Sequence, residues 1–356
     1  MTNWTLYPDN HQAWNSMLAD CAKAEKSIVL EQFIFTADDL GNRLINICAE
    51  RAKAGVRVRF LWDAAGSFTF WGSGIVEDLR GKGIELVFWK TLIPSYFKMP
   101  DIRSWFFRNH RRTLVIDQKI AYTGSICVDD GMKNWRDTNV RLEEDVVLEM
   151  ESSFDRMWDR TKKIRPLTKQ LISKNKEFRY VTNSPGPGHK HIYKEFLHTI
   201  RRAKDSIYIT TPYFVPTHRL AHALRSVARR GVAVNILLPE NSDHYAVDLG
   251  ARSFFNTLLE AGAHIFLYHG NIIHGKTIVI DGKWSSVGSM NLDSISLLYN
   301  FEANIITTDS EFAKTLTSHF ERDIKESKEV SLKEWRSRFF IDKIPEILIK
   351  LVRKFL

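Results

Sequence analysis

The chain has 356 residues, a hydrophobic content of 44% and a formal net charge of +9 at pH 7. This length is sufficient to bury a large core in one or two domains. The positive charge favours an anionic partner, such as a phospholipid surface, nucleic acid or a phosphorylated substrate, without choosing among them.

The cysteines and the apolar runs exclude several classes of protein. Cys21, Cys48 and Cys127 have neither the spacing of a metal site nor that of a disulfide framework, which favours a reducing compartment. The chain begins with a polar stretch and has no uninterrupted apolar run of about 18 residues. We therefore expect no signal peptide, no transmembrane helix and a peripheral location on the cytoplasmic side of the membrane.

The first predicted elements alternate between helices and strands. Residues 9–26 show a helical pattern of apolar positions, and residues 27–35 read as a buried strand. A second helix is expected over 41–54, ended by Gly55, and a second strand over 56–61. The order strand, helix, strand is typical of a parallel βαβ unit.

The same order returns in the second half of the chain, which indicates an internal duplication. The triplet Ala54-Gly55-Val56 corresponds to Arg230-Gly231-Val232. The second set of helix, strand, helix and strand is predicted over 193–204, 207–213, 220–230 and 232–238.

We therefore predict an α/β fold in which two similar α/β/α lobes pack together around one shared active site. Residues 1–165 would form the first lobe and 191–328 the second. A polar, basic segment rich in glycine and proline near its end predicts a linker over 166–190. A basic amphipathic C-terminal segment is predicted over 329–356.

Two aromatic stretches interrupt this pattern without a regular period. Residues 66–74 carry three aromatic side chains between glycines, and residues 89–107 carry several more together with two prolines. These side chains either pack on the core or contact acyl chains beside an active site. The sequence leaves both interpretations open.

The C-terminal residues 333–356 are basic and amphipathic. Ile344, Leu348, Leu351 and Phe355 share one helical face, and lysines and arginines lie off it. Either this helix docks on the body of the protein or it lies in the surface of an anionic bilayer. The flanking cations and the preceding aromatic residues favour the bilayer.

Two nearly identical strings carry the chemistry. Residues 273–281 read Ile-His-Gly-Lys-Thr-Ile-Val-Ile-Asp and are followed by Gly-Ser-Met-Asn at 288–291. Residues 109–117 read Asn-His-Arg-Arg-Thr-Leu-Val-Ile-Asp and are followed by Gly-Ser at 124–125. The interval between histidine and Gly-Ser is the same in both, so the chain contains two copies of one catalytic half.

The residue types in these strings suit an anionic electrophile, above all a phosphate. Residues 277–280 are β-branched and apolar, which predicts a short buried strand. Side chains alternate along a strand, so His274 and Lys276 point to the same face. An imidazole beside a fixed cation is the combination that phosphate chemistry requires.

The doubled His-x-Lys-x4-Asp string resembles that of the phospholipase D superfamily. Further stretches resemble bacterial cardiolipin synthases: Thr-Pro-Tyr-Phe-Val-Pro at 211–216, Arg-Gly-Val-Ala-Val at 230–234, Trp-Arg-Asp-Thr at 135–138 and Asn-Phe-Glu at 300–302. The similarity covers nearly the whole chain up to about Lys328. Full-length relatives often carry transmembrane helices at their start.

The resemblance implies a double displacement at phosphorus through a phosphohistidine. It implies His110 as nucleophile and His274 as acid and base, although the near symmetry of the halves leaves this order open. Arg112 and Lys276 would neutralise the phosphoryl oxygens, so neither a metal nor another cofactor is expected. Further hydrogen bonds to the substrate would come from Ser125, Ser289 and Asn291.

Carboxylates complete the expected site, because a nucleophilic imidazole needs an acceptor on its far nitrogen. The resemblance implies Glu302 as the partner of His274 and Asp137 as the partner of His110. The aspartates that close the two catalytic motifs lie farther along the strand and are expected to be structural, through backbone or lysine hydrogen bonds: Asp117 and Asp281.

The first string departs from the family pattern at two positions. Arg112 replaces the lysine, so that a planar fork replaces a compact ammonium. Cys127 stands where Gly-Ser-x-Asn places an asparagine, and we interpret it as a small buried replacement rather than a second nucleophile. The two departures are compatible with a first half of reduced or altered activity.

By resemblance, the expected reaction transfers a phosphatidyl group from one phosphatidylglycerol to a second, giving cardiolipin and glycerol. The partners would be anionic phospholipid and a membrane surface, and the oligomeric state stays open. One alternative is hydrolysis of a phospholipid or of a nucleic-acid phosphodiester. Small nucleases of the superfamily carry one string and dimerise, which argues against the nuclease. A non-catalytic lipid- or phosphate-binding module is the other alternative, against which the intact second string argues.

Overall fold

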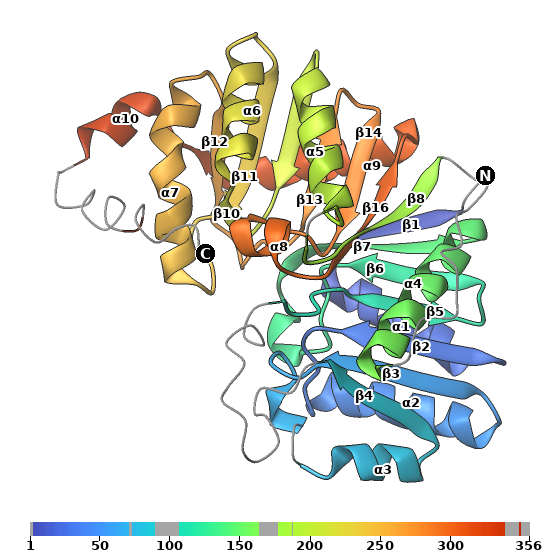
Figure 1. Ribbon diagram of the computed structural model, residues 1–356. Coiled ribbons are helices and arrows are strands. Elements are labelled where there is room, and N and C mark those ends of the chain that lie inside the picture. Colours follow the sequence, from blue (N-terminus) through green and yellow to red (C-terminus); the bar gives the residue numbers. More distant parts are fainter. Residues whose placement is uncertain are drawn as a thin grey trace.

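The computed structural model describes residues 3–70, 73–89, 107–163, 177–186, 188–338 and 349. Within these residues two large mixed sheets form the two lobes, one above the other in the view of Figure 1. The strand order is β1-β7-β6-β5-β2-β3-β4 in the first sheet and β17-β12-β11-β9-β13-β14-β16-β8 in the second.

The first lobe places helices on both faces of its sheet. Its elements are β1 (Trp4–Asp9), α1 (Asn10–Ala22), β2 (Ser27–Gln32), α2 (Asp39–Lys53), β3 (Arg57–Asp63), η1 (Phe68–Phe70), α3 (Ile75–Gly81), β4 (Ile84–Trp89), β5 (Thr113–Ile116), β6 (Ile120–Gly124), η3 (Asp130–Met132), β7 (Arg136–Glu143) and α4 (Asp145–Thr161). Strand β2 pairs in parallel with β3 and antiparallel with β5. The predicted βαβ unit is present, and the strand of the first motif lies directly beside it.

The second lobe repeats this arrangement. Its elements are β8 (Phe178–Asn183), α5 (His191–Arg202), β9 (Ser206–Thr210), β10 (Phe214–Val215), α6 (His218–Ala228), β11 (Ala233–Pro239), α7 (Tyr245–Leu259), β12 (His264–Tyr268), β13 (Thr277–Ile280), β14 (Trp284–Gly288), β15 (Leu292–Asp293), α8 (Ser294–Leu298), β16 (Glu302–Thr307), α9 (Ser310–Ile324), β17 (Ser327–Glu329) and α10 (Leu332–Ser337). Strand β9 pairs in parallel with β11 and antiparallel with β13, as β2 does with β3 and β5. The predicted α/β fold of two similar lobes is confirmed.

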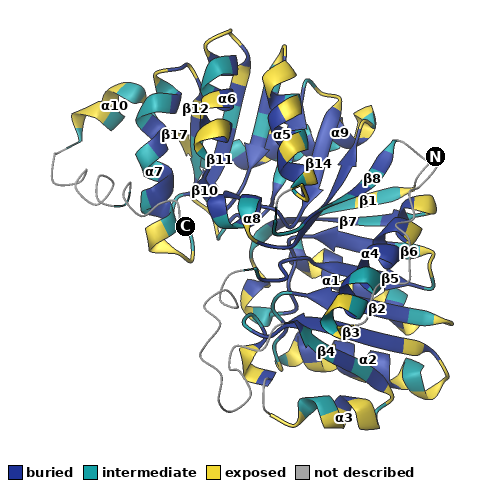
Figure 2. Cartoon of the chain, in the orientation of Figure 1, coloured by how far each residue is buried: buried dark blue, intermediate teal, exposed yellow. Residues whose placement is uncertain are grey.

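An apolar cluster shared by both sheets holds the lobes together. It contains Val115 of β5, Val279 of β13, Phe154 of α4 and Phe312 of α9. Trp4 of the first lobe packs edge-on against Phe312 of the second, with ring centroids 5.0 Å apart. Figure 2 shows the strands buried through the junction. Because this packing removes apolar surface of both lobes from water, it stabilises their mutual position.

The second sheet begins earlier in the sequence than expected. Residues 178–183 lie within the segment predicted as a linker, yet they form β8 and pair along their length with β16. Strand β8 is at the edge of the sheet. An edge strand with one solvent-facing side carries polar residues and therefore reads like a linker. Residues 166–176 and 187 of the predicted linker lie outside the described part of the chain.

The aromatic stretches divide between the two interpretations that the sequence left open. Phe70 and Trp89 are buried, whereas the side chain of Phe68 is 54% exposed. Residues 71–72 and 90–106 lie outside the described ranges.

The beginning of the C-terminal segment docks on the second lobe. Trp335 of α10 packs against Phe255 of α7, with ring centroids 4.8 Å apart. Residues 339–348 and 350–356, which include the predicted amphipathic face, lie outside the described part of the chain. Among the helices that the structure describes, none combines the length and the apolar character needed to span a bilayer.

Candidate active site

The two histidines lie at the junction of the lobes, each directly before the short strand of its motif. The backbone N–H of His110 donates to the carbonyl of Phe301, with an N–O distance of 2.9 Å. The N–H of His274 donates to the carbonyl of Arg136 over 2.7 Å. Each histidine loop is therefore held by the backbone of the other lobe.

The carboxylates pair with the histidines crosswise between the lobes. Nδ1 of His110 lies 2.9 and 3.1 Å from the two carboxylate oxygens of Glu302. Nδ1 of His274 lies 3.1 Å from Oδ2 of Asp137. Both carboxylates were correctly identified from the sequence, but the predicted pairing of Glu302 with His274 and Asp137 with His110 is wrong. The cause is the exchange of backbone hydrogen bonds described above, which brings the start of β16 to His110 and that of β7 to His274.

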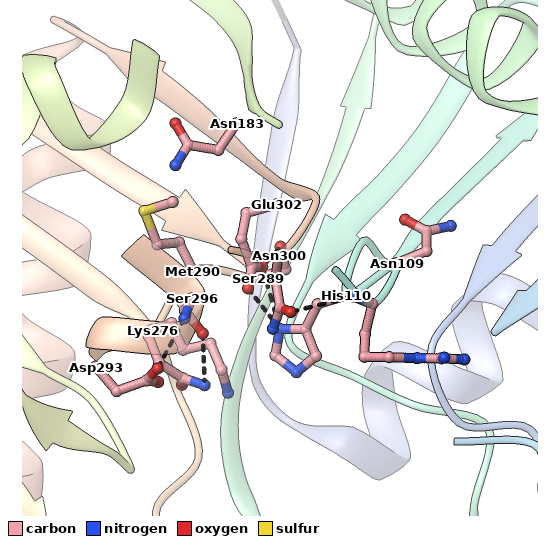
Figure 3. Close-up of polar contacts among 12 residues, drawn as sticks. Asn109, His110, Asn183, Lys276, Ser289, Met290, Asp293, Ser296, Asn300 and Glu302 are labelled. Carbon is pink, nitrogen blue, oxygen red and sulfur yellow. Dashed lines mark hydrogen bonds and ion pairs between the residues drawn. The ribbon is translucent and has the colours of Figure 1, made fainter. Parts of the chain in front are cut away.

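The serines of the two Gly-Ser turns orient these carboxylates. The hydroxyl of Ser289 donates to Glu302, and that of Ser125 donates to Asp137. Figure 3 shows Ser289, Glu302 and His110 in line at the junction, with Lys276 approaching from the second lobe. Each hydroxyl that was predicted to bind phosphoryl oxygens is therefore engaged by a buried carboxylate in this structure.

Two asparagines that sequence reasoning missed fix the Gly-Ser turns. Oδ1 of Asn139 accepts the N–H groups of Ser125 and Ile126 over 3.1 and 3.0 Å. Asn304 accepts the N–H of Met290 over 3.2 Å in the same way. A Cβ on Gly124 would lie 2.3 Å from Oδ1 of Asn139, so only glycine fits there. The repeated spacing acid-x-Asn, in 137–139 and 302–304, is the signal that could have identified these residues.

Each imidazole presents the same nitrogen to the motif cation. Nη2 of Arg112 lies 3.0 Å from Nε2 of His110, and Nζ of Lys276 lies 3.0 Å from Nε2 of His274. Since Nδ1 faces a carboxylate acceptor and Nε2 faces a donor, each neutral ring carries its proton on Nδ1. The lone pair on Nε2 is then available for an electrophile. The cation beside it can neutralise the oxygens of an anionic electrophile.

Burial and neighbouring charge keep both imidazoles neutral. Burial, reinforced by Arg112, Lys276 and His274, lowers the pKa of His110 well below its ordinary value. Burial and Lys276 lower the pKa of His274 to about 4, against the opposing effect of Asp137. Because His110 senses Lys276 and His274 from the other lobe, the two motifs share one electrostatic environment.

The remaining charges give the site a positive bias. Burial, followed by the charge of Arg112, lowers the pKa of Lys276 to about 7. Burial opposes ionisation of Asp137, but the charge and hydrogen bond of His274 hold the pKa of Asp137 at about 2. Burial raises the pKa of Glu302 well above its ordinary value. Because two buried cations lie beside neutral histidines, binding of an anion would compensate the positive charge of the site.

The aspartates that close the motifs lie at the opposite ends of β5 and β13 from the histidines. Asp117 accepts the backbone N–H groups of Glu25, Lys26 and Ser27 over 2.7 to 2.8 Å. Asp281 accepts those of residues 204–206 over 2.8 to 3.2 Å. The expected backbone hydrogen bonds of both aspartates are present.

Asn291 keeps part of its amide unpaired inside the site. Its side chain is buried, with Nδ2 3.5 Å from Oγ of Ser296 and with no hydrogen-bond partner for Oδ1. Oδ1 accepts hydrogen bonds and therefore suits a donor group, whereas only Nδ2 could donate to a phosphoryl oxygen. Within the described ranges, no group of three His, Cys, Asp or Glu side chains is arranged to hold a metal ion.

Comparison with known proteins extends these observations. The family described as "Cardiolipin synthase, PLD-like domain" matches residues 17–158 and 196–324. The cardiolipin synthase of Clostridium perfringens strain SM101 is 32% identical over 98% of this chain and 75% of its own length. The major cardiolipin synthase ClsA of Bacillus subtilis is 32% identical over 97% of this chain and 73% of its own length.

Two solved structures share the fold. A phosphatidylserine synthase from Haemophilus influenzae aligns with a TM-score of 0.75 and 14% identity, covering 99% of this chain and 92% of its own. A polyphosphate kinase from Porphyromonas gingivalis aligns with a TM-score of 0.59 and 10% identity, over 90% of this chain and 50% of its own. The matched family includes both histidine motifs and both carboxylates of the site. The chain therefore belongs to the cardiolipin synthase family of phospholipase D-like phosphatidyltransferases.

Proposed function

We propose that this protein forms cardiolipin and glycerol from two molecules of phosphatidylglycerol. The observation that carries the proposal is the crosswise pair of oriented, neutral imidazoles, each with a buried cation at its Nε2. A phosphodiester between the rings would meet a nucleophile on one side and a proton carrier on the other. The cardiolipin synthases that are similar over nearly the whole chain support the choice of lipid substrate.

In the first step, Nε2 of His110 attacks phosphorus and the bond to the glycerol oxygen breaks. His274, which is protonated on Nε2 in the substrate complex, gives this proton to the departing glycerol oxygen, and a phosphatidyl group remains on His110. Arg112 and Lys276 leave the Nε2 atoms and neutralise the phosphoryl oxygens as their charge increases. The bound anion also offsets the charge of Lys276, so His274 can be protonated more easily than in the free site.

In the second step, a hydroxyl of the acceptor phosphatidylglycerol gives its proton to His274 and attacks phosphorus. The bond between phosphorus and His110 breaks, cardiolipin leaves, His110 is neutral again, and His274 again carries on Nε2 the proton with which the first step began. The ordinary competitor for the acceptor is water, so transfer rather than hydrolysis requires that the lipid alcohol be held at the site.

We also propose that the site faces a membrane surface at one edge of the sheets. Strands β5 and β13 run antiparallel to β2 and β9, so His110 and His274 lie at the carboxyl edge of the parallel strands. Phe68 follows β3 and Tyr245 follows β11 at this same edge, and they are 54% and 68% exposed. Exposed aromatic side chains around a positively biased site suit peripheral contact with anionic lipid.

Incubation with phosphatidylglycerol vesicles tests the proposed function. We expect cardiolipin and glycerol in equal amounts, measured by mass spectrometry, and co-sedimentation of the protein with these vesicles but not with phosphatidylcholine vesicles. Phosphatidic acid as the sole lipid product would instead establish hydrolysis, and cleavage of single-stranded DNA would establish a nuclease. Binding to the vesicles without turnover would identify a non-catalytic module.

The titration of Lys276 predicts the pH dependence of transfer. The ammonium is present below its lowered pKa of about 7 and is lost as pH rises through that value. We therefore expect kcat/KM to fall above this pH, mainly through KM, because a bound phosphate restores the charge of Lys276. Lys276→Arg keeps a cation at high pH and should lose this alkaline decline, even if its maximal rate is lower. A decline unchanged in Lys276→Arg would exclude Lys276 as its source.

A further inference from the structure

The two departures from the motif pattern contact each other. Nε of Arg112 donates to Sγ of Cys127 over 3.1 Å. The other two nitrogens of the guanidinium contact His110, with Nη1 3.0 Å from its carbonyl oxygen and Nη2 3.0 Å from Nε2. All three nitrogens of Arg112 are therefore engaged, and Cys127 holds the one that does not contact the histidine.

In the second half, Lys276 and Asn291 occupy the positions of Arg112 and Cys127. The single nitrogen of Lys276 lies 2.9 Å from the carbonyl oxygen of His274 and 3.0 Å from its Nε2. These are the two contacts that Arg112 makes with two nitrogens. Asn291 occupies the position of Cys127, and its Oδ1 has no partner. Within the described residues Lys276 makes no hydrogen bond to Asn291, whereas Arg112 makes one to Cys127, so only the first half couples its cation to this side chain.

Burial explains why the first half needs a different side chain at this position. Arg112 is 3% exposed and Cys127 is completely buried. The Nε–H of the rigid guanidinium points away from His110, which the two Nη groups contact, and a buried N–H without an acceptor is unfavourable. The cysteine sulfur accepts this N–H, and the side chain has no further atom beyond the sulfur. An asparagine extends one bond farther than cysteine, and because Nε of Arg112 is only 3.1 Å from Sγ, an amide with the same side-chain torsion would crowd the guanidinium.

We propose that Cys127 is a positioning residue that fixes the guanidinium of Arg112 against His110. Arg112 and Cys127 form a matched pair that replaces the Lys-Asn pair of the other half as a unit. The first half is then catalytically competent with a different pair of side chains, and it is not a degenerate copy. This inference rests on the proposed function for its main readout and extends it by assigning a role to a residue outside the expected catalytic set.

A double-mutant cycle tests the pair, with cardiolipin formation on phosphatidylglycerol vesicles as the readout. We expect Arg112→Lys and Cys127→Asn each to lower kcat/KM by about 10-fold or more, within the coupling range of contacting residues. The double variant should recover to within about 3-fold of the parent protein, because it recreates the geometry of the second half. Cys127→Ala should resemble the single variants, whereas Cys127→Ser, which keeps an acceptor, should lose less.

A second buried cysteine provides the matched control. Cys48 lies in the apolar cluster of the first lobe that also contains Cys127, and Cys48→Ala should leave kcat/KM within about 2-fold of the parent. Thermal unfolding of every variant separates folding from positioning, because a merely structural role gives activity losses that follow Tm. A double variant no more active than its less active single variant would overturn the proposal, as would a fully active Cys127→Ala.

Failure of the proposed function has a different outcome. In that case the parent protein makes no cardiolipin, and the same cycle is measured as affinity for inorganic phosphate by calorimetry. The pair predicts weaker phosphate binding in both single variants and recovery in the double variant. Additive losses of phosphate affinity would contradict the matched pair, whatever the reaction of the protein is.

Discussion

Replacement of His110 by alanine is expected to abolish cardiolipin formation, with a loss of about 10⁴-fold or more. The variant lacks the only atom that we propose to bond to phosphorus, and water cannot reproduce its placement between Glu302 and Arg112. His274→Ala is expected to lose about 10²- to 10⁴-fold, because it removes proton transfer but leaves the nucleophile. Both are measured as initial rates on phosphatidylglycerol vesicles.

A substrate with an activated leaving group separates the two roles. From a phosphatidyl ester of p-nitrophenol, the leaving group departs as p-nitrophenolate and needs no proton. His274→Ala should therefore release p-nitrophenolate and accumulate the phosphatidyl group on the protein. His110→Ala should release none. The matched control is His264→Ala, since His264 is exposed on β12 and forms its ion pair with Glu329, a residue outside the site. Release by His110→Ala but not by His274→Ala would reverse the assignment, and full activity of either variant would reject the two-histidine mechanism.

The crosswise carboxylates carry the second large effect. We expect Glu302→Gln and Asp137→Asn each to lower the rate by about 10²- to 10⁴-fold. The amides keep the shape, but an NH2 group, which donates, replaces one of the two carboxylate oxygens that accept from Nδ1 of histidine and from the serine hydroxyl. The imidazole then loses its fixed tautomer. Thermal unfolding checks that each variant stays folded.

The same activated ester identifies which histidine each carboxylate serves. Because Asp137 holds the acid, Asp137→Asn should recover release of p-nitrophenol. Because Glu302 holds the nucleophile, Glu302→Gln should not. The pairing that the sequence suggested predicts the opposite pattern, so this one comparison distinguishes the two arrangements in solution. Ser289→Ala, which removes the hydroxyl donor of Glu302, should resemble Glu302→Gln in direction with a smaller loss.

The features predicted correctly from the sequence are those that depend on a local pattern of residues. The motif strand at 277–280 was predicted because a short run of β-branched and apolar residues is a local property of the sequence. The same holds for Asp117 and Asp281, whose distance along the strand was enough to predict backbone hydrogen bonds. Strand β8 was missed because an edge strand has only one buried face, so its sequence alone resembles a polar linker.

The amino-acid sequence by itself determined that this protein has two copies of a phosphate-directed motif, and which histidines, cations and carboxylates belong to the site. These follow from residue types at fixed spacing. Only the tertiary structure decided that Glu302 serves His110, that Asp137 serves His274, and that the serines hold carboxylates. Those partners come from opposite lobes, and the packing that brings them together depends on the whole buried junction, which no spacing along the chain encodes. The contact between Arg112 and Cys127 is decided in the same way, because two separate departures in sequence become one pair only when β5 and the turn after β6 lie side by side.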